Sequence, residues 1–312
     1  MQVHTISADS KVEKSWAGGP MGNGVIPAPR RTVASIVIPA RNEGRVITRG
    51  LESILRSAEA GEFEIVVVCN GCTDDTAEQA RRFGPAVKVI ETPISSKIHA
   101  LNLGDQHVTA FPRFYVDADI EIPAGAIRDV AVLLRDDSPI LVAAPRAVVA
   151  YEDRPFLIRA FYRVWTRLPY FCENMIGSGV YAFSRKGRER FAQFPEITAD
   201  DEFARLTASP AERRSSAATP FTIHPPRTVH GLLEIMTRAR SGMYELEQKF
   251  PQLGENNQTS SGRTLRIIAR TPSMWRDAPV YLGVMMLAKL RAERLLRRGG
   301  RPAWQRDDTS RQ

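Results

Sequence analysis

The sequence predicts an α/β protein with a Rossmann-like, mostly parallel sheet that is covered by helices on both faces. Short apolar runs without alternation, such as residues 35–38, are typical of strands buried on both faces. These runs alternate along the chain with segments of helical periodicity, which is the order expected for a parallel sheet with crossover helices. The composition agrees, because 43% of the 312 residues are hydrophobic and 25% are charged, as in proteins with a sizeable core.

The individual elements follow from the periodicity of apolar residues. Strands are expected at 35–38, 64–69, 87–91 and 114–116. Helices are expected between them at about 46–55, 73–83 and 96–108. In the second half, helices are expected at about 124–135, 154–168, 185–194 and 230–249, and strands at about 140–150 and 178–183. Residues 1–32 are rich in Gly, Pro and Ser and predict a flexible tail, as do residues 299–312. A main domain over 33–250 and a helical extension over 251–298 lie between the tails.

Composition also limits the compartment and the partners. The chain has no run of about 18 apolar residues, its first 14 residues lack the apolar stretch of a signal peptide, and its three cysteines are an odd number. We therefore expect a cytoplasmic protein without a disulfide framework. The net charge of +8 favours an anionic partner such as a nucleotide diphosphate, anionic lipid or nucleic acid, or is simply a solvated basic surface. Scattered basic residues argue against nucleic acid.

Polar clusters follow the predicted strands at 39–43, 70–71 and 117–119, and another opens the helix after 95. Ligands of open α/β sheets bind at the carboxyl ends of the strands, so these clusters indicate one site. Asp117 and Asp119 are two residues apart, and in an extended chain both carboxylates face the same side. Oxygen ligands at this spacing suit Mg²⁺ or Mn²⁺ bridging a diphosphate, although a solvated turn has the same pattern.

Other residues in these clusters have two interpretations each. Asn70 either hydrogen-bonds a base edge or is a left-handed turn residue before Gly71. Lys97 either approaches a phosphate or is solvated. Cys69 and Cys72 form a C-x-x-C pair at a strand-to-helix junction, which is also the pattern of a dithiol oxidoreductase. Two acidic residues follow at once and oppose a thiolate there, and the chain offers a poor ligand set for zinc.

Together these segments resemble the inverting family-two glycosyltransferases of the GT-A fold. The resemblance rests on SIVIPARNE (35–43), VVVCNGCTDDT (66–76), KIHALN (97–102), VDAD (116–119), GSGVY (177–181) and ADDEF (199–203). It covers roughly 33–250, with a donor half at 33–123 and an acceptor half at 124–250. It implies transfer of a sugar from a nucleotide-diphosphate sugar to an acceptor hydroxyl, and a glycan or lipid-linked acceptor that the sequence does not identify.

The resemblance also implies a role for each motif. Pro39, Ala40, Glu43 and Asn70 contact the nucleoside, and Asp117 and Asp119 handle ribose, diphosphate and a Mn²⁺ or Mg²⁺ ion. Lys97, from the reasoning above, joins the donor-binding set. The segment Gly177, Ser178 and Gly179 borders the acceptor, and Asp200 is the catalytic base.

This chain departs from the family pattern at several points. Many relatives have Asp where this chain has Asn70, so a GDP-sugar competes with a UDP-sugar as donor. Ala199 replaces the usual Glu, which makes Asp201 a competitor of Asp200 as the base. The Gln-x-x-Arg-Trp signature of processive synthases is absent, which favours a single transfer. A nucleotidyltransferase on a related fold, which releases pyrophosphate, is the nearest enzymatic alternative.

Three further features have alternatives of their own. His224 or His230 is either a third metal ligand or structural. Phe161 and Trp165 are four residues apart on one helical face, so we expect them in the core rather than stacked on an acceptor. Residues 280–298 join an apolar run to a series of basic residues. This helix either packs its apolar face on the domain or lies on an anionic membrane as a peripheral contact.

Overall fold

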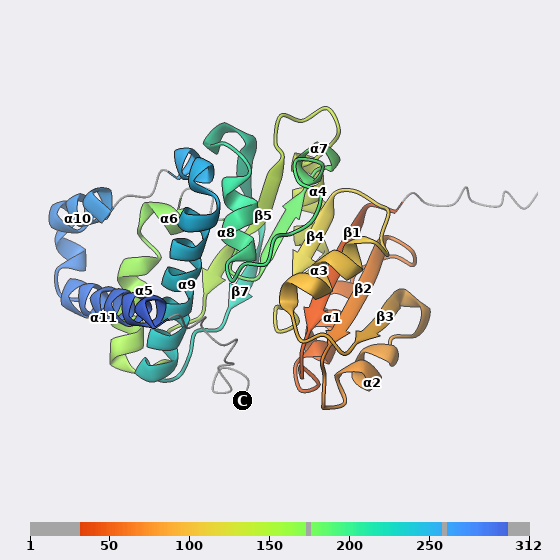
Figure 1. Cartoon of the computed structure of the whole chain (residues 1–312), viewed down its shortest axis with the longest axis horizontal. Coiled ribbons are helices and arrows are strands. Elements are labelled where there is room, and N and C mark those ends of the chain that lie inside the picture. The colour runs from red at the N-terminus through yellow and green to blue at the C-terminus, as the bar shows by residue number, and fades with distance from the viewer. Residues whose placement is uncertain (1–31, 173–175, 258–260, 299–312) are drawn as a thin grey trace, which may run out of the picture. The chain divides into compact units, whose positions relative to one another are not determined.

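The computed structural model describes residues 32–172, 176–257 and 261–298. Seven strands form one sheet in the order β3-β2-β1-β4-β6-β5-β7 (Figure 1). The strands are β1 (Ala34–Ala40), β2 (Phe63–Asn70), β3 (Val87–Thr92), β4 (Arg113–Val116), β5 (Val142–Val149), β6 (Val180–Phe183) and β7 (Arg213–Ile223). β6 runs antiparallel to its neighbours β4 and β5, whereas the other pairs are parallel. The predicted mostly parallel sheet is confirmed.

Helices cover both faces of this sheet, as expected. One core contains residues of α1 (Ile47–Leu55), α2 (Thr76–Arg81) and α4 (Ala124–Leu133), and the other contains residues of α3 (Lys97–Asp105) and α8 (Asp200–Leu206). β1 shows how the sequence produces two cores. Ile36 and Ile38 belong to the first core and Val37 to the second, because successive side chains of a strand point to opposite faces.

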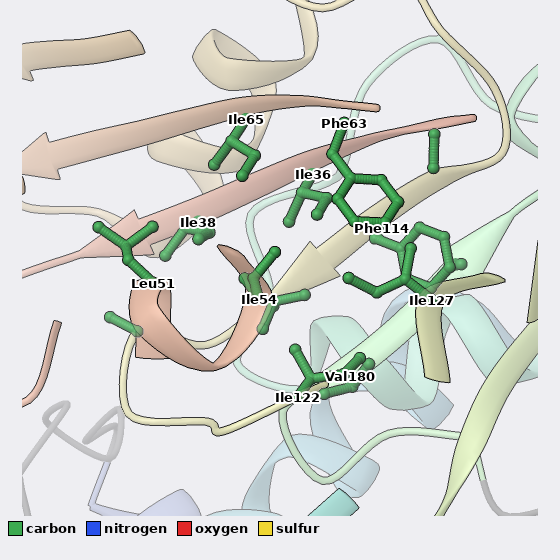
Figure 2. Packing of buried hydrophobic residues seen from close by; sticks show 14 of the residues in the cluster. Ile36, Ile38, Leu51, Ile54, Phe63, Ile65, Phe114, Ile122, Ile127 and Val180 are labelled. Carbon is green, nitrogen blue, oxygen red and sulfur yellow. The ribbon is translucent and has the colours of Figure 1, made fainter. Parts of the chain in front are cut away.

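The first core is built from large aliphatic and aromatic side chains. Figure 2 shows Leu51 and Ile54 of α1 beside Ile36 and Ile38 of β1 and Phe114 of β4. These side chains are at most 2% exposed. Each contributes roughly 2 kcal/mol of hydrophobic stabilisation. The polar loops at the sheet edge are therefore held on a rigid base.

A third core joins the ends of β5 and β7 to the C-terminal helices. It contains Phe161, Leu232 and Tyr281, with Val149 of β5, and Ile223 of β7 packs against it. The expectation that Phe161 is a core residue is confirmed, since it is fully buried, and Trp165 packs against the same core. The remaining helices are α5 (Phe156–Trp165), α6 (Pro169–Cys172), α7 (Arg185–Arg188), α9 (Val229–Lys249), α10 (Ser261–Arg270) and α11 (Ala278–Arg297). Short 3₁₀ turns are η1 (Gly84–Ala86), η2 (Pro210–Glu212), η3 (Pro251–Asn256) and η4 (Pro272–Met274).

Two elements differ from the sequence prediction. The helix expected at 185–194 ends at Arg188, whose guanidinium is buried and donates to Phe191 O at 2.6 Å. This contact turns the chain so that Phe191 and Phe194 enter the second core region. β7 was not predicted at all. No helix in the described ranges is long and apolar enough to cross a membrane. The predicted tails lie outside the described residues apart from Thr32, and the proposed donor and acceptor halves stay a prediction.

Candidate active site

The parallel strands β2, β1 and β4 end at one edge of the sheet, and the predicted site residues follow them there. Ala40 is the last residue of β1, Asn70 is the last residue of β2, and Asp117 directly follows β4. Because β1 pairs in parallel with both other strands, their carboxyl ends point the same way. The predicted convergence of these side chains therefore has a topological basis.

Asn70 is fully buried, and neither polar atom of its amide has a hydrogen-bond partner in the described part of the chain. The left-handed conformation in this turn belongs to Gly71 (φ 62°), not to Asn70. The interpretation of Asn70 as a left-handed turn residue is therefore wrong. A buried amide without partners costs about 1–3 kcal/mol, which any ligand group that bonds to it would offset.

The loops after β1 and β2 are tied together by hydrogen bonds. Asn42, at φ 51°, accepts the backbone N–H of Thr73 at 2.6 Å through Oδ1. Its own N–H donates to Cys72 Sγ at 3.3 Å, and Glu43 N–H donates to Thr76 Oγ1 at 2.7 Å. Residues of the 66–76 motif thus hold the backbone of Asn42 and Glu43, which fixes the loop that directly follows Pro39 and Ala40 at the end of β1.

The two cysteines of this loop are free thiols with different surroundings. Cys69 is 1% exposed in the first core, and Cys72 is half-buried and contacts the Asn42 backbone. A hydrogen bond from Cys69 lowers the pKa of Cys72. The structural contacts of Cys72 account for its place in the loop without a redox reaction.

Lys97 is the first residue of α3, a helix whose Ser96 cap accepts the backbone N–H of His99. Its ammonium lies 2.8 Å from Asp117 Oδ1 and 2.9 Å from Asp200 Oδ1. Burial lowers the pKa of Lys97, but the two carboxylates outweigh this effect and raise it above its usual range. One positive charge therefore joins two predicted site residues that are far apart in the sequence.

The Asp117–Asp119 segment is a turn and not the extended chain that the sequence analysis assumed. Ile120 N–H donates to Asp117 O at 3.1 Å, which closes the turn. Asp119 lies inside it, and both carboxylates belong to half-buried residues. The same turn is joined to the glycine-rich segment, because Asp117 N–H donates to Gly179 O at 2.8 Å.

The end of β7 brings a histidine close to the residues that follow this turn. Glu121 forms an antiparallel bridge with Thr222, and His224 Nε2 lies 3.8 Å from Glu121 Oε1. His230 instead pairs with Glu234 on α9. Of the two histidines, His224 is thus the one close to Glu121, two residues after Asp119. No group of three or more His, Cys, Asp or Glu side chains is arranged around a common metal position in the described ranges.

The glycine-rich turn needs its glycines because of both conformation and space. Gly177 and Gly179 have φ of 122° and 89°. A Cβ on Gly177 would lie 2.7 Å from Asp201 Oδ2, and one on Gly179 would lie 2.9 Å from Ile120 Cγ1. Between them, Ser178 N–H donates to Asp201 Oδ2 at 3.2 Å. The turn therefore fits closely between the Asp117 loop and the start of α8.

Asp200 and Asp201 open α8 in different environments. Asp200 is 3% exposed, and its Oδ2 accepts the Tyr181 hydroxyl at 2.9 Å. Burial, followed by the charge of Asp200, raises the pKa of Asp201 to about 6. The N-cap residue of α8 is Ala199, which makes no side-chain cap, but Asp201 Oδ1 accepts the backbone N–H of Glu202 at 2.8 Å. Asp201 therefore satisfies one backbone donor of the first turn of α8, a structural role that stands beside its candidacy as the base.

Tyr181 is a site residue for which the sequence analysis gave no role. Its neighbours Val180 and Ala182 belong to the first core, whereas Tyr181 faces the second core and reaches Asp200. The alternation of β6 was the available signal, because it separates Tyr181 from Val180 and Ala182.

The sequence model of the family described as "Glycosyl transferase family 2" matches residues 35–190, which is half of the chain. The chain belongs to glycosyl transferase family 2. All the strand-end motifs described above up to the glycine-rich turn lie inside the matched range. The protein is thus a glycosyltransferase by family, whereas the acids of α8 lie beyond the match. No curated protein sequence matched.

Solved structures with similar folds are glycosyltransferases of the GT-A type. Mannosyltransferase PcManGT from Pyrobaculum calidifontis, in complex with GDP-Man and Mn²⁺, has a TM-score of 0.57 at 21% identity, over 85% of this chain and 79% of that one. S. aureus TarS with UDP-GlcNAc has a TM-score of 0.51 at 14% identity, over 86% and 92%. Glucosyl-3-phosphoglycerate synthase from Mycobacterium tuberculosis, with Mn²⁺, UDP-Glc and phosphoglyceric acid, has a TM-score of 0.50 at 19% identity, over 69% and 78%. At this identity they support the GT-A fold of the family-two chain.

Proposed function

We propose that this chain transfers a sugar from a nucleotide-diphosphate sugar to an acceptor hydroxyl in one inverting displacement. The observation that carries the proposal is the Lys97 ammonium between Asp117 and Asp200, at 2.8 and 2.9 Å. Asp117 belongs to the proposed donor side and Asp200 to the proposed acceptor side. Because one ammonium contacts both carboxylates, a donor bound at Asp117 and an acceptor bound at Asp200 would lie next to each other.

The nucleoside is proposed to bind at the ends of β1 and β2. Pro39 and Ala40 end β1, Glu43 lies on the following loop that the β2–α2 segment holds in shape, and Asn70 contributes an amide that is free to accept and donate. An amide fits the edge of either uracil or guanine. The similar structures contain GDP-Man or UDP-sugars, so a UDP-sugar is proposed first and a GDP-sugar second.

Asp117, Asp119 and His224 are the residues that would hold a divalent cation. Two carboxylates and an imidazole are ligands that Mn²⁺ accepts, and Mg²⁺ favours the carboxylates. Asp117 Oδ1 is already bonded to the Lys97 ammonium at 2.8 Å, so a divalent ion would share this carboxylate with Lys97. Two of the similar structures contain Mn²⁺. A bound ion would neutralise negative charge on the departing diphosphate.

Asp200 is proposed as the general base that takes the proton from the acceptor hydroxyl. Tyr181 and Lys97 hold one oxygen of its carboxylate each, which fixes its orientation. Asp201 remains the competing candidate, because a carboxylate with a pKa of about 6 is well matched to accept a proton near neutral pH. Ser178, bonded to Asp201, lies where the acceptor is proposed to bind.

A single displacement needs no covalent intermediate, so no nucleophilic Ser or Cys is assigned. Transfer of one sugar per encounter is proposed because the signature of processive synthases is absent from the sequence. The acceptor class, a glycan or a lipid-linked molecule, and the expected cytoplasmic location stay predictions.

A screen of nucleotide sugars tests the proposal. UDP-glucose, UDP-N-acetylglucosamine and GDP-mannose are each incubated with the protein and Mn²⁺, and the release of nucleoside diphosphate is followed. We expect release from one of them, and we expect it to fall in Asp200→Asn. Release of pyrophosphate would favour a nucleotidyltransferase. Dithiol exchange that depends on Cys69 and Cys72, without any nucleotide release, would favour the oxidoreductase. The same screen with His224→Ala tests whether His224 is a metal ligand. If it is, the variant should need a higher Mn²⁺ concentration for the same release of nucleoside diphosphate.

A further inference from the structure

The last helix, α11, is fixed to the protein by one of its faces. Tyr281, Val284 and Ala288 are buried in or beside the third core, against α5 and α9. The start of the helix is held by Asp277, whose two carboxylate oxygens accept from Arg163 at 2.7 and 2.8 Å. The direction in which the opposite face points is therefore determined by packing.

That opposite face carries a row of exposed side chains at intervals of four residues. Leu282, Met286 and Leu290 are 38%, 58% and 41% exposed, and Arg294 and Arg298 continue the same row. Residues four apart are offset by about 40° around an α-helix, so this series winds slowly across the exposed half of α11 over about 24 Å and ends at Arg298, the residue after the helix. It is apolar over its first half and cationic over its second.

Neighbouring residues widen this surface. Leu287 is 50% exposed and is followed four residues later by exposed Arg291. A Cβ built on Gly283 would meet no atom within 4 Å, so no described residue covers the helix there. The single acid of the helix, Glu293, lies 3.9 Å from Lys289. We call the exposed residues Leu282, Met286, Leu287, Leu290, Arg291, Arg294, Arg297 and Arg298 the α11 outer face.

The structure thus divides the apolar run that the sequence analysis read in two ways. Tyr281 and Val284 pack on the domain, whereas Leu282, Met286 and Leu287 point away from it. One face of α11 therefore packs on the protein, and a different face is exposed and available to contact another surface.

We propose that the α11 outer face binds the surface of an anionic phospholipid membrane. Exposed apolar side chains on a packed helix lose contact with water when they enter the interface between headgroups and acyl chains. The arginines at the end of the same row would meet the anionic headgroups, and this complementarity of charge selects a membrane as the partner. Exposed Trp275, three residues before α11, is of the type enriched at membrane interfaces. The proposal is independent of the proposed transfer reaction.

Flotation of the full-length protein with liposomes tests this proposal without any nucleotide sugar. The probes are vesicles of phosphatidylcholine alone and vesicles of phosphatidylcholine with an equal amount of phosphatidylglycerol. Two sets of variants remove the two properties separately. One is Leu282→Gln with Met286→Gln, and the other is Arg291→Gln with Arg294→Gln. The matched controls are Val132→Gln and Arg135→Gln, which alter an exposed valine and an exposed arginine at α4.

The wild-type protein is expected to float with the anionic vesicles and not with the neutral ones. The arginine variant should partition about 30-fold less, from roughly 1 kcal/mol per basic residue near the surface. The partitioning of the leucine–methionine variant to the anionic vesicles should be at least about tenfold weaker than that of the wild type. Both controls should partition like the wild type. Circular dichroism confirms that each variant is folded, which is expected because all the altered side chains are exposed.

Three outcomes would overturn the proposal. The first is no flotation of the wild type with either vesicle, and the second is equal flotation with both. The third is a wild-type dimer in sedimentation that the α11 variants dissociate without any flotation, because the outer face would then be an interface between two copies of the chain.

Discussion

Replacing Lys97 by Met should lower the free energy of unfolding by about 2 kcal/mol at neutral pH. The substitution keeps the length and the apolar stem of the side chain and removes only its charge. In the wild type this charge lies between Asp117 Oδ1 at 2.8 Å and Asp200 Oδ1 at 2.9 Å. Without it, two carboxylates face each other across the space that the ammonium occupied.

The magnitude follows from the distances and the exposure of the three groups. Two charges about 5 Å apart repel each other by about 3 kcal/mol at an effective dielectric constant of about 20. The side chain of Asp200 is 4% exposed and that of Asp117 is 38% exposed, so solvent screens one end of the pair and reduces the repulsion. About 2 kcal/mol remains, which corresponds to a fall in Tm of about 3 °C for a protein of this size.

The pH dependence distinguishes this cause from a simple loss of packing. In Lys97→Met, the two carboxylates repel each other only while both are ionised, so the folded variant favours uptake of one proton. A carboxyl group with a raised folded pKa contributes stability below its unfolded pKa, near 4, and that stability is lost as the pH rises through the folded value. The difference in Tm between variant and wild type should therefore be large at pH 7–8 and shrink towards pH 4.

Calorimetry at both pH values measures this difference. Lys289→Met is the matched control, because Lys289 is 53% exposed and lies 3.9 Å from Glu293 on one helix. Removing such a pair costs less than about 1 kcal/mol. A Tm deficit of Lys97→Met that is absent at pH 7, or equal at pH 4 and pH 8, would refute the electrostatic reasoning.

Four further predictions concern the proposed chemistry. Asp200→Asn should keep its affinity for the nucleoside diphosphate and lower turnover by about 10²-fold or more, whereas Asp201→Asn should lower it less; the reverse order in steady-state kinetics would move the base to Asp201. Asp201→Asn should raise Tm at pH 8 but not at pH 4, because burial and Asp200 raise the pKa of Asp201 to about 6 and its stabilising contribution is lost as the pH rises through that value. Calorimetric binding of nucleoside diphosphate should weaken strongly with chelator and in Asp119→Ala, and equal affinity with and without divalent metal would contradict the metal assignment. Cys69→Ser combined with Cys72→Ser should retain most transfer activity, and a folded but inactive double variant would restore the dithiol alternative.

The first half of the sheet was predictable because its strands are continuous apolar runs. In β1 and β2 every residue except Glu64 is buried, and such runs have few interpretations other than a strand covered on both faces. The parallel order then brought the polar residues that follow each strand to one edge. This reasoning needed no contacts between distant residues, which is why it succeeded from the sequence.

β7 shows where the same reasoning fails. Its sequence, RRSSAATPFTI, mixes basic, polar and small residues, and several of them are exposed because β7 is the last strand of the sheet and has one neighbour. An edge strand has no strong apolar pattern, so its pairing with β5 depends on tertiary context. The position of His224 near Glu121 depends on this pairing, so it could not be predicted from the sequence.

The contact between Lys97 and Asp200 was equally invisible. From the sequence, Lys97 was expected either near a phosphate or in solvent, and Asp200 was expected to be the catalytic base. Their ion pair joins the first residue of α3 to the first residue of α8, both of which lie on the second face of the sheet. Only the packing of two separate helices against one sheet creates that contact.

The glycine-rich turn has a consequence for inhibitors of such an enzyme. Gly179 O accepts the backbone N–H of Asp117, and Ser178 N–H donates to the side chain of Asp201, so the proposed donor and acceptor regions are both bonded to one short turn. Any displacement of the turn by a ligand on one side is transmitted to the other, and linkage requires the influence to be equal in both directions. A single compound that joins a nucleoside diphosphate to an acceptor mimic would occupy both regions in one binding event. Two separate inhibitors would show the coupling only when both are bound.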